Sequence, residues 1–381
     1  MTAFSTNSMN IKPFRALLAQ FTQIESADAF CGNAKYAFQE YLAAALYERH
    51  SADALYIYQI ESHRQKHTGL VALNEVEAFF AGKVLKHEKT LSEKEQQQIQ
   101  LFLEWQSVLK PMLLTHRPVE SLHQRLISYT QHHKPVRTAR FHKEHQTHRI
   151  WAITEPEEIA AIQALFNNNV DQTYIADGHH RTSTMALLHE RRHEYPQFDF
   201  NHLFCAFFPT DQLDILDYNR VVEAFGALST SRFWAQLSKI ADLEVLDTPR
   251  RPTQKHEIVI YLRKEWFALR WKPETVAREQ AQRGVVLDAN LLNELVLRDI
   301  LGIQDARTDS RIAYVDGSKG LDGLRKSVKR SKTRIGFMLF PVLFDDMMFM
   351  ADRGQSLPPK STYFEPRLKS GALVQDLRVE G

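Results

Sequence analysis

The chain has 381 residues, which is enough to bury a sizeable core in one large domain or two ordinary ones. Its 48 basic and 46 acidic residues leave a formal net charge of +2. No strong field remains to steer the protein onto nucleic acid or an anionic membrane, so neither is an expected partner. Two distant cysteines, Cys31 and Cys205, exclude a disulfide framework and a zinc knuckle.

The start of the chain lacks the basic and apolar regions of a signal peptide. The longest apolar run, 335–344, is too short to cross a bilayer. The sequence therefore predicts a cytoplasmic protein.

In the first half of the chain, aromatic and β-branched residues over 54–60 predict a strand, with a hairpin partner at 68–73. Ser92 and Glu95 have the spacing of a capping box, which predicts a helix over 92–109. A short strand over 149–153 precedes a second helix. Thr154 and Glu157 have the same capping spacing, Pro156 fits the first turn, and the helix is expected to end near Phe166, before Asn167–Asn169.

In the second half, apolar patterns predict further strands and helices. The strands are expected at 203–208, 258–262, 267–271 and 334–340, and the helices at 288–301 and 320–329. Strands mostly joined by hairpins, with helices interspersed, predict an α+β fold with mixed sheets. We expect one portion over 1–225 and a second α+β portion over 226–381, or a single continuous domain.

The segment with the most chemical content begins where a buried strand over 173–176 ends. Asp177, Gly178, His179, His180 and Arg181 follow before a helix expected from about 182 to 193. A helix N-terminus offers free N–H groups and the positive end of the helix dipole, which attract anions.

Each residue of this turn suits a phosphate site. Gly178 permits a tight turn and close approach of a ligand, Arg181 has a guanidinium that matches phosphate oxygens, and the two histidines add donors. Asp177 is placed to hold a metal ion or to orient a histidine. The alternative interpretation is a capped turn with Asp177 as the N-cap and the histidines on the surface.

Five stretches, in this order along the chain, carry a resemblance to a known family. They are Ile-Lys-Pro-Phe-Arg-Ala-Leu at 11–17, Lys-His-Glu-Lys-Thr at 86–90, Ile-Ala-Asp-Gly-His-His-Arg at 175–181, Leu-Asp-Tyr-Asn-Arg-Val-Val at 216–222, and Pro-Pro-Lys-Ser-Thr-Tyr-Phe-Glu-Pro-Arg-Leu at 358–368. On these stretches the chain resembles the DUF1015 family over nearly its whole length. It departs from the family's pattern after Arg15, where a Pro-Pro-Tyr-Asp stretch is missing, and at Asp217 and Asn219, which replace the usual proline and histidine.

The resemblance implies a distant relation to free L-serine kinases and a core with the fold shared by sulfiredoxin and the ParB nucleotide-binding domain. It implies that Gly178, His179, His180, Arg181 and Thr182 bind a nucleotide.

The expected chemistry is transfer of a phosphoryl group from ATP or ADP to the hydroxyl of free L-serine or a similar metabolite. The resemblance implies that Glu88 is the general base and that Asp177 takes part in catalysis, with a Mg²⁺ ion that Asp177 could hold. His87, Lys360 and Ser361 are further candidates for contact with substrate or phosphate. Lys360 and Ser361 could equally belong to a loop that only leads into a final strand over 373–377.

Two other functions remain open. The first is a nucleotide-binding regulatory or switch protein without turnover, as in the ParB relatives. The second, a redox enzyme like sulfiredoxin, is disfavoured because the turn carries histidines where that chemistry needs cysteine.

Overall fold

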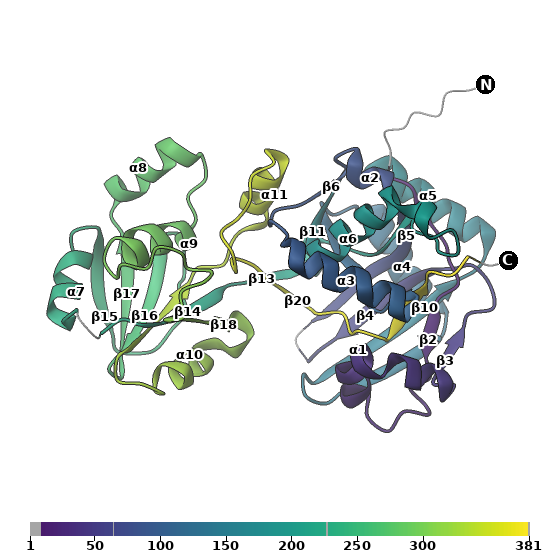
Figure 1. Ribbon diagram of the computed structural model, residues 1–381, viewed down its shortest axis with the longest axis horizontal. Coiled ribbons are helices and arrows are strands. Elements are labelled where there is room, and N and C mark those ends of the chain that lie inside the picture. The colour runs from purple at the N-terminus through teal and green to yellow at the C-terminus, as the bar shows by residue number, and fades with distance from the viewer. Residues whose placement is uncertain (1–8, 64, 226–227, 380–381) are drawn as a thin grey trace. The chain divides into compact units, whose positions relative to one another are not determined.

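A computed structural model describes residues 9–63, 65–225 and 228–379 (Figure 1). The contacts divide this part of the chain into two compact units. Unit 1 comprises residues 1–214 and 366–381, and unit 2 comprises residues 215–365. These two units differ from the two portions expected from the sequence, which met at a single boundary after residue 225. The C-terminal segment returns to unit 1 and adds a strand there.

Unit 1 is built on one large mixed sheet. In spatial order its strands are β6 (Val84–Leu85), β11 (Thr173–Asp177), β8 (Met112–His116), β12 (His202–Pro209), β5 (Lys66–Glu75), β4 (Leu55–Glu61), β10 (Gln146–Ile153) and β9 (Arg137–Phe141), with β1 (Ile11–Lys12) also paired to β5. The central strands are buried on both faces, which explains the continuous apolar run over 203–208. Cys205 lies in that core, fully buried.

Helices and a smaller sheet complete unit 1. The helices are α1 (Ala27–Ala43), α2 (Glu77–Phe80), α3 (Ser92–Trp105), α4 (Glu120–His132), α5 (Pro156–Asn169) and α6 (His179–Glu190). The smaller sheet runs in the order β3 (Tyr47–Arg49), β2 (Leu17–Ala19), β21 (Leu373–Asp376) and β7 (Ser107–Val108). Helix α6 packs on β8 and β12 and also against α3, whose backbone accepts a bond from Thr184 (Figure 1).

Unit 2 is an antiparallel sheet covered on both faces. Its strands follow the order β15 (Ala241–Leu246), β17 (Glu265–Trp271), β16 (Glu257–Leu262), β19 (Arg334–Leu339), β14 (Tyr218–Glu223) and β18 (Ile312–Asp316). The short strands β13 (Asp214–Leu216) and β20 (Tyr363–Glu365) pair with each other. The helices are α7 (Thr230–Leu237), α8 (Pro273–Arg283), α9 (Asp288–Leu291), the π-helix that continues it over Leu292–Arg298, α10 (Gly320–Val328) and α11 (Phe344–Asp352).

Two apolar clusters hold this sheet. Phe233 of α7 and Leu292 of the π-helix pack on one face with Ile258 and Phe337. Leu324 of α10 packs with other apolar side chains on strands of the sheet in a separate cluster.

The α+β fold class with mixed sheets and interspersed helices is confirmed. Several expected boundaries were wrong. Leu91 and Glu155, rather than Ser92 and Thr154, occupy the N-cap positions of α3 and α5, without a side-chain cap bond. Helix α3 stops at Trp105 because Gln106 turns left-handed and the next residues join β21 as strand β7. Helix α5 extends through the asparagines to Asn169.

No helix in the described part of the chain combines the length and the apolar character needed to span a membrane.

Candidate functional site

The strand pairing brings three chain segments to one edge of the large sheet. Strand β11 ends at Asp177, and β6 runs parallel to it, so residues 86–88 leave the sheet at the same end. Strand β8 is antiparallel to β11, with Leu113 opposite Asp177, so the residues before β8 also lie at this end. Lys110 is therefore placed beside Asp177 although 67 positions separate them in the sequence.

Asp177 is the centre of a cationic cluster. Its Oδ2 atom accepts a hydrogen bond from Lys110 Nζ at 2.7 Å and lies 3.3 Å from an Arg181 guanidinium nitrogen. Burial alone would raise the pKa of Asp177, but the positive charges of Lys110, Arg181 and Arg367 outweigh it and hold the pKa below its ordinary value. Asp177 is therefore ionised at neutral pH, and three cations act on this one carboxylate.

Gly178 makes the turn possible for two reasons. Its φ of +108° lies in the left-handed region that favours glycine, and a Cβ there would meet the Arg181 guanidinium at 2.8 Å. The side chain of Arg181 thus folds back over Gly178 and reaches both Asp177 and the carbonyl oxygen of Pro111.

Gly178 is also the N-cap of α6, so the helix begins at His179 rather than at the expected Thr182. The first helical bond joins Thr182 N–H to the carbonyl of Gly178 at 2.9 Å. The N–H groups of His179 and Arg181 consequently have no acceptor one turn earlier in the helix. They point along the helix axis toward the positive end of its dipole, at the same sheet edge as Lys110.

His179 links the turn to the segment after β6. Its buried ring lies edge-on to His87, with ring centroids 4.5 Å apart, and its Nε2 accepts the backbone N–H of His87 at 3.5 Å. Burial lowers the pKa of His179 to about 4, with the cations around it adding to the effect, so the ring is neutral at pH 7. Burial also lowers the pKa of His87 well below the ordinary value.

The tautomer of His179 follows from these contacts. Because Nε2 acts as an acceptor, the single proton of the neutral ring is assigned to Nδ1. That Nδ1 lies 4.0 Å from Glu88 Oε2. The Glu88 side chain is 46% exposed, so its carboxylate remains accessible to a ligand.

The remaining residues predicted for this site are placed as follows. Thr182 is buried, and its hydroxyl donates to the Gly178 carbonyl at 3.2 Å, which is a contact within the turn itself. His180 is partly buried in the first turn of α6. Lys360 and Ser361 belong to unit 2, where Lys360 Nζ lies 5.2 Å from the Tyr218 ring centre and the buried Ser361 hydroxyl donates to Pro358 O at 2.6 Å.

Sequence reasoning missed Lys110 and Arg367. The Lys-Pro pair directly before the apolar stretch Met112–His116 is the available signal for Lys110, because it marks the start of a buried strand. Its partner could be found only by knowing that this strand is antiparallel to β11. Arg367 lies in the 358–368 stretch that the family resemblance singled out, but nothing local connects it with residue 177.

The fold and the site together define an α+β protein with a cation-rich strand–turn–helix at the edge of a mixed sheet. The chain belongs to the family described as "Protein of unknown function (DUF1015)", whose model matches residues 16–290. The expected family membership is therefore confirmed.

Comparison with solved structures finds similar chains of low identity. A C-terminally truncated SbnI from Staphylococcus aureus superposes with a TM-score of 0.41 at 12% identity, covering 79% of this chain and 85% of SbnI. A free serine kinase variant in complex with ADP gives a TM-score of 0.38 at 15% identity, covering 81% and 92% of the two chains. Scores this low carry no argument about function. A search of curated proteins finds no match.

Proposed function

We propose that the turn around Asp177 binds the phosphates of ATP or ADP and supports phosphoryl transfer to the hydroxyl of free L-serine or a similar small metabolite. The observation that carries the proposal is the convergence of Lys110, Arg181 and Arg367 on the Asp177 carboxylate. Lys110 and Arg181 share this one carboxylate, which leaves positive charge at the turn to attract a polyanion. The start of α6 adds the positive end of its dipole.

The ion pairs give these cations a defined geometry before a ligand arrives. Phosphoryl transfer depends mainly on positioning and on stabilising charge, so cations fixed in advance are the residues it requires. In this proposal Asp177 is a positioning residue, because it holds Lys110 and Arg181. The two phosphate-binding side chains would then exchange part of their contact with Asp177 for phosphate oxygens.

Glu88 is proposed as the general base. Its carboxylate lies on the Nδ1–H side of neutral His179, which would orient it by donating a hydrogen bond once the 4.0 Å gap narrows on binding. The acceptor hydroxyl would give its proton to Glu88 as its oxygen bonds to the transferred phosphorus. The nucleotide leaves with the electron pair of the broken P–O bond.

The oxygen donors at this turn also suit Mg²⁺. The ion takes oxygen ligands and is usually held by one or two carboxylates together with substrate phosphates. Asp177 fits this requirement, since both of its cationic partners bind Oδ2 and leave Oδ1 for another ligand. Glu88 is the second accessible carboxylate. Such an ion would neutralise charge on the bound phosphates.

The proposal is tested by incubating the protein with Mg²⁺, L-serine and either ATP or ADP, and by measuring O-phosphoserine by mass spectrometry. Product that disappears in Glu88→Gln but persists in Glu93→Gln supports the assignment, because Glu93 is an exposed glutamate at the start of α3. Nucleotide binding without any phosphorylated amino acid would overturn the kinase assignment and favour a nucleotide-dependent switch.

A further inference from the structure

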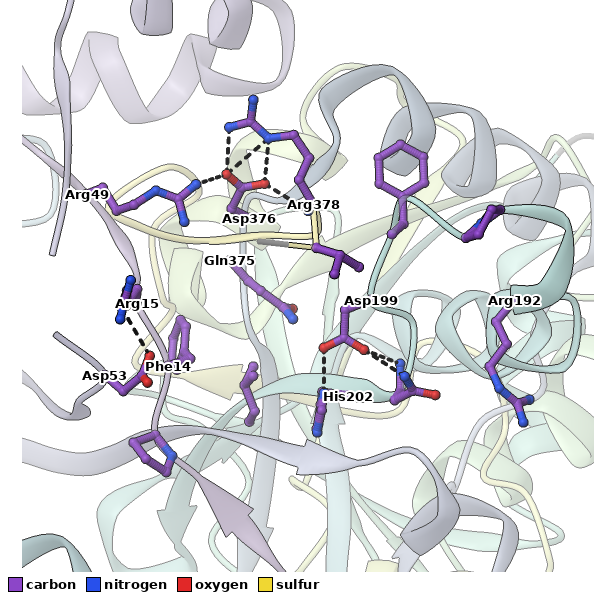
Figure 2. Close-up of a pocket in the computed structure, with 16 residues that line it drawn as sticks. Phe14, Arg15, Arg49, Asp53, Arg192, Asp199, His202, Gln375, Asp376 and Arg378 are labelled. Carbon is purple, nitrogen blue, oxygen red and sulfur yellow. Dashed lines mark hydrogen bonds and ion pairs between the residues drawn. The ribbon is translucent and has the colours of Figure 1, made fainter. Parts of the chain in front are cut away.

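A cavity with a volume of about 640 Å³ lies in unit 1 (Figure 2). This volume falls within the range of small-molecule sites. Its described lining combines residues 13–15, Arg49, Asp53 and Leu73 with residues from 192–202 and the C-terminal residues Gln375, Asp376, Arg378 and Val379. None of the residues of the Asp177 site belongs to this lining, so the cavity is a separate feature.

The charged lining favours an anion. Four arginines, Arg15, Arg49, Arg192 and Arg378, face three aspartates around the cavity. Asp376 is nearly fully buried and pairs with both Arg49 and Arg378, and the Arg378 guanidinium bonds both of its oxygens (Figure 2). Two guanidinium groups therefore share one carboxylate and are held in place before any ligand binds.

Gln375 adds a second, independent indication of a ligand. Its side chain is only 3% exposed, and Figure 2 shows its amide extending from β21 toward the middle of the cavity. Its Oε1 atom is buried and has no hydrogen-bond partner among the described residues. A buried amide oxygen without a partner is costly, and natural proteins rarely retain one without a reason.

Apolar and polar groups on the other walls limit the size and character of the ligand. Phe14, Phe198 and Leu73 form apolar surface, which suits a short carbon skeleton. On the facing wall His202 is bonded through Nδ1 to Asp199 at 2.7 Å (Figure 2). Asp199 is thus a fixed acceptor, which would repel an oxyanion at this wall and can accept a hydrogen bond from a hydroxyl group.

We propose that this cavity binds a small oxyanion, a carboxylate or a phosphate, on a short carbon skeleton that also carries a hydroxyl group. The arginines would hold the oxyanion, and the hydroxyl would donate to the unbonded Gln375 amide oxygen. The site stands apart from the proposed kinase activity and does not depend on it. Its wall is completed by residues of the C-terminal segment that returns to unit 1.

The test uses calorimetric titration of the full-length protein with two matched pairs of probes. Malate and succinate differ by one hydroxyl, as do propane-1,2-diol 1-phosphate and propyl phosphate. We expect the hydroxyl-rich member of at least one pair to bind about fivefold more tightly, the effect of one hydrogen bond. The pair that binds identifies the oxyanion as a carboxylate or a phosphate.

Variants separate this site from the Asp177 site. Gln375→Met should retain binding but lose the preference within the pair, whereas Arg15→Ala should weaken both members about tenfold. Arg140→Ala, at an exposed position of β9, is the matched control and should bind like the wild type. Arg15 is half-exposed and its variant is expected to fold, which circular dichroism checks.

The proposal is overturned if none of the four probes binds at millimolar concentration, or if Arg181→Ala abolishes their binding while Arg15→Ala does not. It is also overturned if Gln375→Met folds and keeps the full preference for the hydroxylated member.

Discussion

Lys110 Nζ lies 2.7 Å from Asp177 Oδ2 and thereby joins the start of β8 to the end of β11. Both side chains are largely shielded from solvent, with 18% and 30% exposure. Burial lowers the pKa of Lys110, although the charge of Asp177 opposes that shift. The pair thus organises the sheet edge at which the nucleotide is proposed to bind.

Replacing Lys110 by methionine should lower the free energy of unfolding by about 1–3 kcal/mol, because it leaves a shielded carboxylate with one cationic hydrogen-bond partner fewer. The free energy is measured by urea denaturation of the full-length protein, with hydrogen exchange of amides in unit 1 used to monitor unfolding. Adding Asp177→Asn should restore part of the loss, since it removes the carboxylate that Lys110→Met leaves with one partner fewer, although Arg181 then loses its ion-pair partner. Losses that simply add in the double variant would show that the two side chains are not coupled.

Gly178→Ala should be destabilising by about 1–3 kcal/mol, because alanine is strained at a φ of +108° and its Cβ would meet the Arg181 guanidinium. The displaced guanidinium should also weaken nucleotide binding. Gly32→Ala is the matched control. Gly32 lies in α1, and an added Cβ there meets nothing within 4 Å, so this change should stabilise the helix by about 0.5–1 kcal/mol. Thermal unfolding measures the change in stability of each variant. Equal changes in Gly178→Ala and Gly32→Ala would contradict this explanation.

Arg181→Ala should weaken ATP and ADP binding by at least tenfold, since it removes a charge-assisted contact to phosphate. Isothermal titration measures the affinity. Arg191→Ala serves as the control, because Arg191 is exposed and pairs only locally with Glu194. Unchanged nucleotide affinity in Arg181→Ala would remove Arg181 from the phosphate site.

The sequence was informative about this region where the signals are local. A buried strand, a glycine and a helix start can be read within ten residues. The first residue of α6 could not be predicted from the sequence. Asp177 suits an N-cap by propensity, but its carboxylate is taken by Lys110 and Arg181, and Gly178 caps the helix instead.

Contacts that depend on strand pairing could not be predicted from residues that are neighbours in the sequence. Lys110 approaches Asp177 only because β8 is antiparallel to β11, and that pairing depends on the whole sheet. The 640 Å³ cavity was missed for the same reason, since it combines residues near 15, 50, 200 and 376. The contacts that Lys360 and Ser361 make within unit 2 do not test the roles predicted for them.

Unit 1 should lose stability as the pH falls from 7 to 5. His148 is buried in β10 beside Tyr58, and burial lowers its pKa to about 3, below the ordinary value of 6.5. The unfolded chain therefore takes up a proton below pH 6.5 while the folded state does not, and folding becomes less favourable as the pH falls. The expected loss is about 2 kcal/mol for this one histidine between pH 7 and pH 5.

Hydrogen exchange of amides in β4 and β10, corrected for intrinsic rates, measures this loss at the two pH values. His148→Gln removes the titrating group and should flatten the pH dependence by that amount. An equally steep dependence in the variant would show that His148 is protonated in the folded state or does not control stability.

The most direct test of the proposed activity is the assay of O-phosphoserine with nucleotide binding measured on the same samples. We expect the wild type to form O-phosphoserine from L-serine with ATP or ADP. We expect Glu88→Gln to bind nucleotide with unchanged affinity but to turn over about a hundred- to ten-thousandfold more slowly. Turnover in Glu88→Gln at the wild-type rate, or the absence of product from a wild-type protein that binds nucleotide, would contradict it.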